Sequence, residues 1–322
     1  SGELLFTILS SLAQEESRNI SENTRWGIRS RFQQGIPHIN TTGFLGYDKD
    51  EAGHLIVNQE QAKVVRRIFQ DFLEGWQPSE IARKLNEEKV PGVHGEPRWA
   101  AISVLRILRN EKYKGDLLMQ KYYVRDFLTR ELERNDGRLT QYYIENNHEA
   151  IVERELWEAA QLEQKRIEAF KKTHQIRELG SGSLEPFYGK IFCSQCGGRF
   201  VKKRGKSQWR CINTIGEKRK NCQVQPVSEE KIEEQLSLAW AELVSRRGNL
   251  LSDWEKEASK GNPLESLRAS QMQELTGKYP AWHHAAKKKR MLIQEILICQ
   301  GSVHAVVFMD GIRLQAGEID NE

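Results

Sequence analysis

The sequence predicts a multidomain α+β protein. Three observations predict it: apolar residues at helical spacing near the N-terminus, three further helical segments between residues 59 and 110, and four cysteines between residues 193 and 222. We therefore expect a long N-terminal helix at residues 1–34 and a mainly helical, helix-turn-helix-like domain with a strand pair at 35–178. A four-cysteine zinc ribbon with appended helices and a terminal β-hairpin is expected at 186–322.

Length and composition indicate an intracellular protein of several domains. A chain of 322 residues is long enough for two or three domains. A net charge of +4 does not by itself identify a partner. The sequence contains no run of 18 apolar residues and no signal-peptide pattern, which predicts a cytoplasmic protein without membrane contact. Five cysteines, an odd number, argue against a disulfide framework.

The first helix has two different halves. Its N-terminal half carries one strongly apolar face, made by Leu4, Leu5, Ile8, Leu9 and Leu12. After Glu16 the helix is polar and basic, and one acid, Glu22, stands among four arginines: Arg18, Arg25, Arg29 and Arg31. At 1.5 Å per residue the helix is about 50 Å long. The N-terminal half therefore predicts an apolar partner, and the C-terminal half predicts contact with a polyanion or with water.

The next segment combines short strands, turns and helices. Residues 36–58 predict loops and short strands with a turn at 48–53, and helices follow at 59–74, 79–89 and 98–110. Apolar residues at helical spacing are expected to be buried: Ala62, Val65, Ile68, Phe69, Phe72, Ile81, Leu85, Trp99, Val104, Leu105 and Leu108.

These three helices permit two interpretations. They fit a helix-turn-helix arrangement or a purely structural three-helix core. Periodicity alone favours neither, because the eight-residue link before the last helix is longer than the usual three or four. Charge favours DNA binding, since residues 98–125 carry seven basic side chains and two acidic ones.

A strand pair, a helix and a linker complete this region. Residues 114–127 and 137–152 are rich in Tyr, Val, Leu and Thr and predict two strands bridged by a charged loop. A helix is predicted at 153–172. The Gly/Ser/Pro stretch at 177–186 is the clearest linker in the chain.

The cysteines have the spacing of a metal site. Cys193 and Cys196 form a Cys-x2-Cys turn, fourteen residues separate Cys196 from Cys211, and ten separate Cys211 from Cys222. Two thiolates on a tight turn can occupy adjacent corners of a tetrahedron, and a hairpin can supply the second pair. This pattern predicts one structural Zn²⁺. Two disulfides or unrelated thiols are the alternatives, and Cys299 is expected to be a buried core thiol rather than a fifth ligand.

Basic residues surround the cysteines. From Lys190 to Cys222 there are ten basic residues and one acid, Glu217, with Trp209 among them. A solvated charged face is one interpretation, and polyanion binding by a compact zinc scaffold is the favoured one. The candidate residues are Lys202, Lys203, Arg204, Lys206, Arg210, Lys218, Arg219 and Lys220.

The C-terminal part predicts helices at 228–244, 264–279 and 281–298, and then a β-hairpin around Asp310-Gly311. The adjacent pair His283-His284 cannot face one metal ion from one helix, so both are expected at the surface. The first of these helices is expected to bury Ile232, Leu236, Trp240 and Leu243.

In this order the segments resemble the large serine recombinases, the serine integrases and transposon recombinases of phages and mobile elements. The resemblance covers roughly residues 3 to 240 and rests on six stretches: LAQEESRNISENTRWGIRSRFQQG, GYDKDEAGHLIVNQEQAKVVRRIFQDFLEG, SEIARKLNEEKVPG, VLRILRNEKYKGD, NNHEAIVERELWEAAQ and FCSQCGGRF. The remaining residues match loosely.

The resemblance implies a function for the parent enzyme. In that family a resolvase-type catalytic domain precedes the long helix, whose apolar half packs on that domain and on partner subunits. The implied reaction is DNA integration or excision through 5′-phosphoserine links, subunit rotation and religation, with no metal at the active site. Because the chain starts inside the helix, we expect the catalytic serine domain to be absent, the fragment to be inactive alone, and no catalytic residue in it.

The resemblance also implies partners and contacts. Double-stranded DNA is bound at an attachment or transposon-end half-site in a bacterial or phage host cell, by parent subunits that form a dimer on one site and a tetramer in synapsis. The helix end and the loop at 35–42 would track the minor groove, and the helix at 98–110 would enter the major groove. Expected contacts outside the ribbon are Arg25, Arg29, Arg31, Arg98, Ser103, Arg106, Arg109 and Lys112.

Two other classes stay open. A transcriptional regulator would combine the helix-turn-helix and zinc ribbon with a dimerising first helix, and it would lack an upstream catalytic domain in its reading frame. A protein-interaction module would use the ribbon and C-terminal helices to bind protein, and it would show no salt-dependent affinity for DNA.

Overall fold

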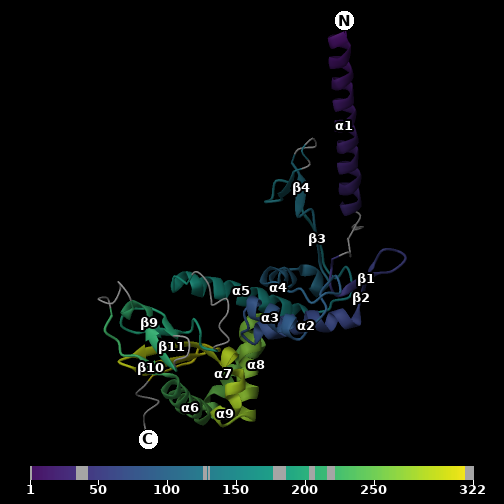
Figure 1. Cartoon of the computed structure of the whole chain (residues 1–322). Coiled ribbons are helices and arrows are strands. Elements are labelled where there is room, and N and C mark those ends of the chain that lie inside the picture. The colour runs from purple at the N-terminus through teal and green to yellow at the C-terminus, as the bar shows by residue number, and fades with distance from the viewer. Residues whose placement is uncertain are drawn as a thin grey trace. The chain divides into compact units, whose positions relative to one another are not determined.

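The computed structural model describes residues 2–33, 43–125, 129, 131–176, 186–202, 207–215 and 222–315 (Figure 1). The chain divides into two compact units. Unit 1 comprises Ser1–Lys63 and Asn110–Val152, and unit 2 comprises Val64–Arg109 and Glu153–Glu322. Each unit is described by itself. The domain boundaries expected from the order of motifs stay a prediction.

Unit 1 begins with the long helix that the sequence predicts. Helix α1 runs from Gly2 to Gln33. Its apolar face is exposed: Leu4 is 69% exposed and Leu12 is 61% exposed. A helix of this length with an exposed apolar face has no core of its own to stabilise it, so this face is suited to a partner surface.

The rest of unit 1 is built from short antiparallel ladders, and these confirm the predicted strands. A second ladder extends the predicted strand pair. The paired strands are β1 (Tyr47–Lys49) with β2 (Leu55–Val57), β3 (Leu117–Met119) with β6 (Tyr142–Ile144), and β4 (Tyr122–Val124) with β5 (Leu132–Arg134). The 3-10 turn η1 spans Glu111–Lys114.

Aromatic rings hold these ladders together. The rings of Tyr47 and Tyr113 are stacked with their centroids 6.2 Å apart, and both side chains are buried. The Tyr113 hydroxyl donates to the Leu45 carbonyl at 3.0 Å, so its polar atom is satisfied inside the core. His148 meets the Tyr47 ring edge-on at 5.0 Å. Residues that are distant in sequence therefore form one small core.

The three predicted helices are present. Helix α2 starts in unit 1 and continues into unit 2, where α3, α4 and α5 follow. Their bounds are Gln59–Leu73 for α2, Pro78–Glu87 for α3, Ala101–Leu108 for α4 and Arg154–Thr173 for α5. The apolar positions of α2 and α3 are buried as predicted, Phe69 and Leu85 completely. The Glu80 carboxylate accepts from the Gln77 N–H at 2.9 Å and closes the first turn of α3.

Helix α4 is shorter than predicted and starts after Arg98. The Asn86 side chain exchanges two hydrogen bonds with the backbone of Trp99, both 2.8 Å long, which hold that residue outside the helix. The Trp99 indole also donates to the Val90 carbonyl at 2.9 Å. The prediction that Leu105 is fully buried was wrong: it is half-buried, and Ile107 is buried in addition to Val104 and Leu108.

The ribbon and the C-terminal residues form two sheets, and the second contains strands from both. One has the strand order β10-β9-β8 and the other β13-β12-β11-β7. Strands of the ribbon are β7 (Ile191–Cys193), β8 (Phe200–Lys202), β9 (Gln208–Cys211) and β10 (Val227–Ser228), with the turn η2 (Ile212–Thr214) after β9. The C-terminal strands are β11 (Ile293–Cys299), β12 (Ser302–Phe308) and β13 (Arg313–Gln315).

Helices fill the chain between these strands. They are α6 (Glu229–Ser245), α7 (Arg247–Lys260), α8 (Pro263–Lys278), α9 (Trp282–Ala285), η4 (Ala286–Lys288) and α10 (Lys289–Leu292). Two features differ from expectation. The sequence reading omitted α7, and the predicted helix at 281–298 was wrong beyond Leu292, because residues 293–299 form the parallel partner of β7 and the antiparallel partner of β12.

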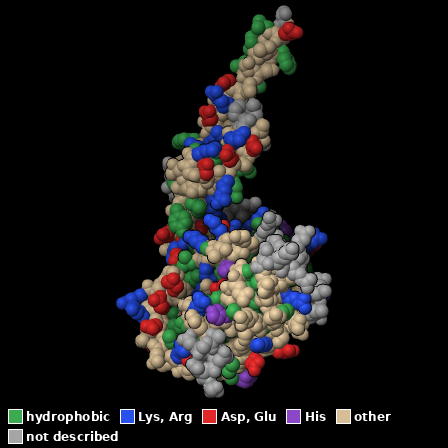
Figure 2. Space-filling view, turned by 90° about the vertical axis from the view of Figure 1, so that its left-hand side faces the viewer, with side chains coloured by type: hydrophobic (Ala, Val, Ile, Leu, Met, Phe, Trp, Pro, Cys, Tyr) green, Lys and Arg blue, Asp and Glu red, His purple; other side chains and the backbone are tan. Residues whose placement is uncertain are grey.

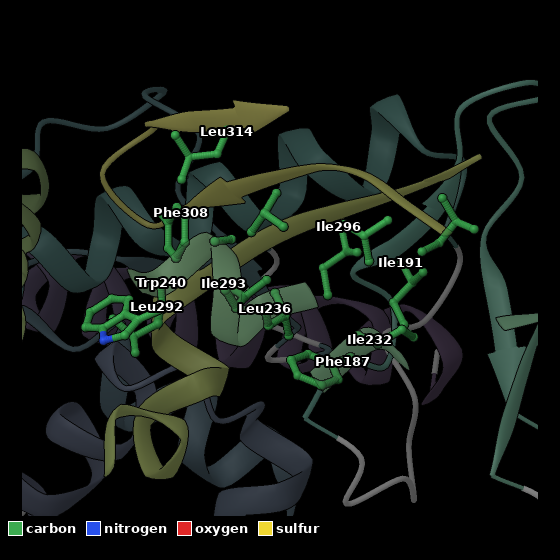
Figure 3. Packing of buried hydrophobic residues seen from close by; sticks show 14 of the residues in the cluster. Phe187, Ile191, Ile232, Leu236, Trp240, Leu292, Ile293, Ile296, Phe308 and Leu314 are labelled. Carbon is green, nitrogen blue, oxygen red and sulfur yellow. The ribbon is translucent and has the colours of Figure 1, made fainter. Parts of the chain in front are cut away.

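One hydrophobic core joins the ribbon to the C-terminal strands and helices. Figure 3 shows Phe187 and Ile191 packed with residues of α6 and the C-terminal sheet. The α6 positions that were predicted to be buried, including Trp240, are fully buried, as are Ile296 and Phe308. The C-terminal hairpin is therefore part of the ribbon's core rather than an appendage. Among the described residues, no helix combines the length and the apolar character needed to cross a membrane.

Candidate metal centre and nucleic-acid interface

Four cysteine side chains converge in the ribbon. The Sγ atoms of Cys193, Cys196, Cys211 and Cys222 all lie within 4.8 Å of one another. The Cys193–Cys222 pair is 3.6 Å apart and the Cys196–Cys211 pair is 3.5 Å apart. A tetrahedron with Zn–S bonds of about 2.3 Å has sulfur–sulfur edges of about 3.8 Å. The donor set therefore fits a four-thiolate metal site, and Cys299 is not among the four.

Local backbone structure positions the first pair of thiols. The Gly197 N–H donates to the Cys193 carbonyl, and the Cys193 N–H donates to the Gly198 carbonyl, both at 2.9 Å. Gly197 has a φ of +67°, which a residue with a side chain rarely adopts. These bonds close a tight turn. The β8–β9 hairpin, in which Phe200 pairs with Cys211, then brings the third thiol to the turn.

Glycine is also required at position 198, because the side chains of Asn213 and Cys211 approach its backbone closely. A Cβ atom on Gly198 would lie 2.6 Å from Asn213 Nδ2 and 3.0 Å from Cys211 Sγ. The Gly198 N–H and the Asn213 amide both donate to Cys196 Sγ at 3.4 Å. Any side chain at 198 would push these groups away from the sulfurs, so glycine at this position keeps the cluster compact.

The four thiols are not equivalent. Burial raises the pKa of Cys193 to about 11 and raises the pKa of Cys211 further. Burial also opposes ionisation of Cys196, but hydrogen bonds from Asn213 and Gly198 outweigh it and lower the pKa of Cys196 to about 7. Cys196 therefore ionises before Cys193 and Cys211, and a bound cation would drive ionisation of those two.

Helix α4 presents one face to solvent. Arg106 and Arg109 are exposed on it, Ser103 is half-buried, and Ile102 is 52% exposed. Arg106 forms no hydrogen bond or ion pair with any residue that the structure describes. Arg109 Nε donates to Gln164 Oε1 of α5 at 2.9 Å. Arg106 is thus the cation on α4 that is available to an external anion, whereas Arg109 is tied to a neighbouring helix.

Two other cations near this segment are engaged within the protein. Arg98 lies 3.4 Å from the Glu96 carboxylate and precedes α4. Lys112 Nζ lies 3.7 Å from Glu111 and 5.8 Å from the centre of the Phe44 ring. Burial lowers the pKa of Lys112. Both residues were expected to contact DNA, and their intramolecular contacts would compete with that role.

The ribbon shows the same contrast between neighbouring cations. Lys202 Nζ lies 2.5 Å from a Glu229 carboxylate oxygen and 5.9 Å from the centre of the Trp209 ring. Trp209 itself is completely buried, so it does not line a binding surface with the basic residues. Arg210 is exposed and has no hydrogen-bonding or ionic partner within the described part of the chain.

Helix α1 carries three of the expected contacts. Arg25 donates to the Val124 carbonyl at 3.0 Å, within unit 1. Arg29 and Arg31 are exposed and make no polar contact with residues that the structure describes. The remaining candidates, Lys203, Arg204, Lys206, Lys218, Arg219 and Lys220, and the predicted minor-groove loop at 35–42 lie outside the described residues.

Sequence reasoning missed two exposed apolar side chains. Ile102 shares the solvent face of α4 with Arg106 and Arg109, since the spacings of four and seven residues return to one side of a helix. Trp26 is exposed on α1 between Arg25 and Arg29. An apolar residue in step with basic ones on an amphipathic helix was the signal that could have identified both.

Charge alone does not mark a binding face. On the side that Figure 2 shows, basic and acidic side chains of the described residues are interspersed, and apolar side chains gather at the top, on the N-terminal part of α1. The pattern agrees with the small net charge of +4. Cations without a polar partner among the described residues are therefore better candidates for an anion-binding surface than overall charge indicates.

Comparison with known proteins gives the class of protein that these features define. The family model described as "Recombinase" matches residues 59–166, and the model described as "Recombinase zinc beta ribbon domain" matches residues 186–240. The first model covers α2, α3, α4 and most of α5, and the second covers the four-cysteine ribbon. The chain therefore belongs to the recombinase family that these two models describe.

Solved structures of other proteins are also similar to this chain, at low sequence identity. One, "Crystal Structure of a LSR-DNA Complex", is 17% identical with a TM-score of 0.43, covering 89% of this chain and 97% of the other. Another, "Sequence Requirements of the Listeria innocua prophage attP site", is 18% identical with a TM-score of 0.40, covering 89% and 99%. No curated protein sequence matches the chain.

Proposed function

We propose that the chain recognises an attachment or transposon-end half-site in duplex DNA, as the DNA-binding part of a site-specific serine recombinase. The observation that carries the proposal is Arg106 on the solvent face of α4, which has no polar partner among the described residues, in a chain matched by recombinase and recombinase zinc ribbon models. Helices of this size enter the major groove, and an arginine there pairs bidentately with guanine.

The other exposed residues have matching roles. Ile102 would contact a thymine methyl group beside the base that Arg106 reads. Arg29 and Arg31 on α1, and Arg210 on the ribbon, would contact phosphates and set the register. If about eight phosphates are neutralised, the logarithm of affinity falls with the logarithm of salt concentration at a slope of about −7.

The metal ion supports this function indirectly, by stabilising the ribbon. We propose that Cys193, Cys196, Cys211 and Cys222 hold one Zn²⁺. All four positions of a tetrahedral ion are then filled by protein, so the ion is structural and leaves no position for a reactive water. Its contribution is to hold β8, β9 and the exposed Arg210 in place.

The proposal assigns recognition, and not cleavage, to these residues. In the parent enzyme the reaction is strand cleavage through 5′-phosphoserine links, exchange and religation, carried out by subunits that form a dimer on each site and a tetramer in synapsis. No catalytic role in that reaction is assigned to any residue of this chain.

Selection from a random duplex pool tests the proposed function. The chain is used to enrich bound duplexes with and without a zinc chelator. We expect one long, asymmetric site that is shortened or weakened at one end by chelation, because the ribbon then loses its fold. A short palindrome would support a dimeric regulator, and failure to enrich or bind any duplex would refute DNA recognition.

A further inference from the structure

A two-stranded ladder of unit 1 has no role in the contacts assigned so far. It is formed by β4, which is labelled in Figure 1, and β5. We call residues 121–125 and 131–139 the β arm. A two-stranded hairpin is at best marginally stable in water by itself, so the arm depends on contacts that hold its base.

A buried asparagine holds the base of the β arm. Asn135 is 6% exposed, and its amide donates to the Gln120 carbonyl at 3.0 Å and to the Leu139 carbonyl at 2.8 Å. Its side-chain oxygen accepts from the backbone N–H groups of Gly137 and Leu139, each at 3.1 Å. The Asn135 N–H donates to the Lys121 carbonyl at 2.8 Å. Both donors and both acceptor positions of the amide are used, which fixes the base of the arm.

The pairing of β4 with β5 gives the β arm two faces. Residues opposite one another in a ladder share a face, and so do residues two positions apart along one strand. Tyr123 lies opposite Glu133 on what we call the closed face. There the Tyr123 hydroxyl donates to the Glu133 carboxylate at 3.1 Å, and Arg138 donates to both side chains at 3.3 Å. The polar groups of this face are therefore paired within the arm.

The other face, which we call the open face, is made by the cross-strand pairs Tyr122–Arg134 and Val124–Leu132. Tyr122 is 61% exposed, Leu132 is 68% exposed, and Arg134 is exposed as well. Neither the Tyr122 hydroxyl nor the Arg134 guanidinium has a polar partner among the residues that the structure describes. None of the four residues of this face is acidic. The open face thus offers a phenol, a guanidinium and an aliphatic group to an external partner.

These groups are complementary to a DNA backbone. A phosphate accepts hydrogen bonds from guanidinium and hydroxyl donors, and an aliphatic side chain can lie against the neighbouring sugar. A second copy of the chain fits the face less well, because a two-fold contact between two open faces would bring together two arginines with no acid between them. The face is also far smaller than the roughly 20–30 residues that each partner contributes to a stable protein interface.

Contacts with α1 place the β arm beside residues that are expected to meet DNA. The Arg25 guanidinium donates to the Val124 carbonyl at 3.0 Å. The ring centroids of Phe32 and Tyr142 lie 6.2 Å apart. Arg29 is exposed and lies between these two contacts along α1. A DNA segment that Arg29 contacts is therefore close to the β arm.

We propose that the open face of the β arm lies along the DNA backbone, beside the segment that α1 contacts. Arg134 and Tyr122 then bond to phosphates, and Leu132 lies against a sugar. This inference rests on the proposed function, because it adds a contact to the same DNA-binding surface. Since phosphates carry no direct sequence information, the arm contributes affinity and register and selects no base.

The salt dependence of binding to the selected site tests the arm. We expect Arg134→Ala to weaken binding about three- to tenfold and to reduce the slope of log affinity against log salt by about 1, with unchanged base preference. Arg134→Lys keeps the charge and should keep the slope. The matched control is Arg138→Ala, which removes an arginine already bonded on the closed face and should leave the slope nearly unchanged. An unaltered slope in Arg134→Ala would overturn the proposal.

A neutral phosphate analogue locates the contact. Methylphosphonate groups replace single phosphates, one at a time, next to the segment that α1 protects. At one or two positions the replacement should weaken binding of the unaltered chain but not of Arg134→Ala, because both changes remove the same contact. Tyr122→Phe removes only a hydroxyl and should lose about two- to tenfold in affinity. Additive effects at every phosphate would contradict the proposed contact.

The outcomes separate the β arm from the proposed function. If the unaltered chain binds its site and both Arg134→Ala and Tyr122→Phe bind it equally well, the arm does not contact DNA, and the proposed function stands. If the unaltered chain binds no duplex, both fail. Reduced self-association of Leu132→Thr in sedimentation, with unchanged DNA affinity, would make the open face a contact between copies and would likewise overturn the proposal. Circular dichroism checks that these exposed substitutions keep the fold.

Discussion

The Sγ atoms of Cys196 and Cys211 lie 3.5 Å apart, although fourteen residues separate the two cysteines in the chain. The Cys196 sulfur accepts hydrogen bonds from two N–H groups, while the Cys211 sulfur is buried and has a raised pKa. Sulfurs this close repel one another once ionised, and a divalent cation removes that repulsion. The stability of the ribbon should therefore depend on metal.

Metal removal and Cys211→Ala should unfold the ribbon. Small zinc modules bind their ion with an apparent free energy of roughly 10–16 kcal/mol, and loss of that energy falls on the strands that carry the thiols. We expect about one Zn²⁺ per chain by elemental analysis, and loss of both the ion and the ribbon's protection from hydrogen exchange in Cys211→Ala. Cys299→Ala is the matched control and should keep the ion. Retained protection in the metal-free chain would contradict the structural role.

Replacing Arg106 should impair specific binding to DNA. Its guanidinium has no partner within the described residues, so Arg106→Ala removes an external contact without leaving a buried charge. We expect a loss of about 1–3 kcal/mol in binding free energy at the selected site and a relaxed preference at one base position. Competition binding with each single-base variant of the site measures both effects. Arg246→Ala, at the residue that follows α6, is the control, and an unchanged base preference in Arg106→Ala would refute the recognition role of α4.

Lys202 and Arg210 should differ in their contribution to salt dependence. Lys202 is paired with Glu229, whereas Arg210 is exposed and makes no polar contact within the described part of the chain. A cation that already has a protein partner releases fewer counterions from DNA. We expect Arg210→Ala to reduce the slope of log affinity against log salt by about 1, and Lys202→Ala to leave the slope nearly unchanged. Equal changes in slope would show that the pair with Glu229 opens on DNA.

His148 should make stability depend on pH below neutrality. Burial lowers the pKa of His148, and its Nε2 lies 2.7 Å from the Lys112 carbonyl. In the unfolded chain the pKa returns to about 6.5, so between the two values the unfolded state binds more protons. The free energy of unfolding should therefore fall as pH decreases below about 6.5. Urea denaturation at pH 5, 6, 7 and 8 should show a flatter profile in His148→Gln than in the unaltered chain.

The local parts of the fold could be predicted from the sequence. Helical spacing identified the buried positions of α2 and α6, because burial on a helix repeats every three or four residues whatever the partner is. The Cys-x2-Cys pattern identified the first half of the metal centre because both of these ligands lie on one local turn. The charge pattern of the sequence also indicated the exposed cations on α4. It did not indicate that Arg109 bonds to Gln164 whereas Arg106 has no polar partner among the described residues.

The rest depended on contacts between distant residues. The segment IQEILI at 293–298 fits a short helix or a strand, and pairing with β7, about a hundred residues earlier, decides for the strand. Lys202 and Arg210 look alike in the sequence, and only the structure shows that Lys202 pairs with Glu229 whereas Arg210 has no polar partner among the described residues. The basic run at 287–290 likewise resembles a DNA-binding cluster until Glu74 and Glu80 are placed beside it.

The last prediction concerns Gly198. Its missing side chain allows Asn213 and Cys211 to approach the turn that carries Cys196, so Gly198→Ala must displace either the amide that supports one sulfur or another sulfur itself. We expect weaker metal binding by roughly 10–100-fold, the usual effect of disturbing groups that support metal ligands. Competition with a zinc-binding dye measures it. Gly248→Ala in α7 is the control: a Cβ there meets nothing within 4 Å, and alanine should stabilise the helix by up to about 1 kcal/mol. Unaltered zinc affinity in Gly198→Ala would mean that the thiols hold the ion without the Asn213 amide.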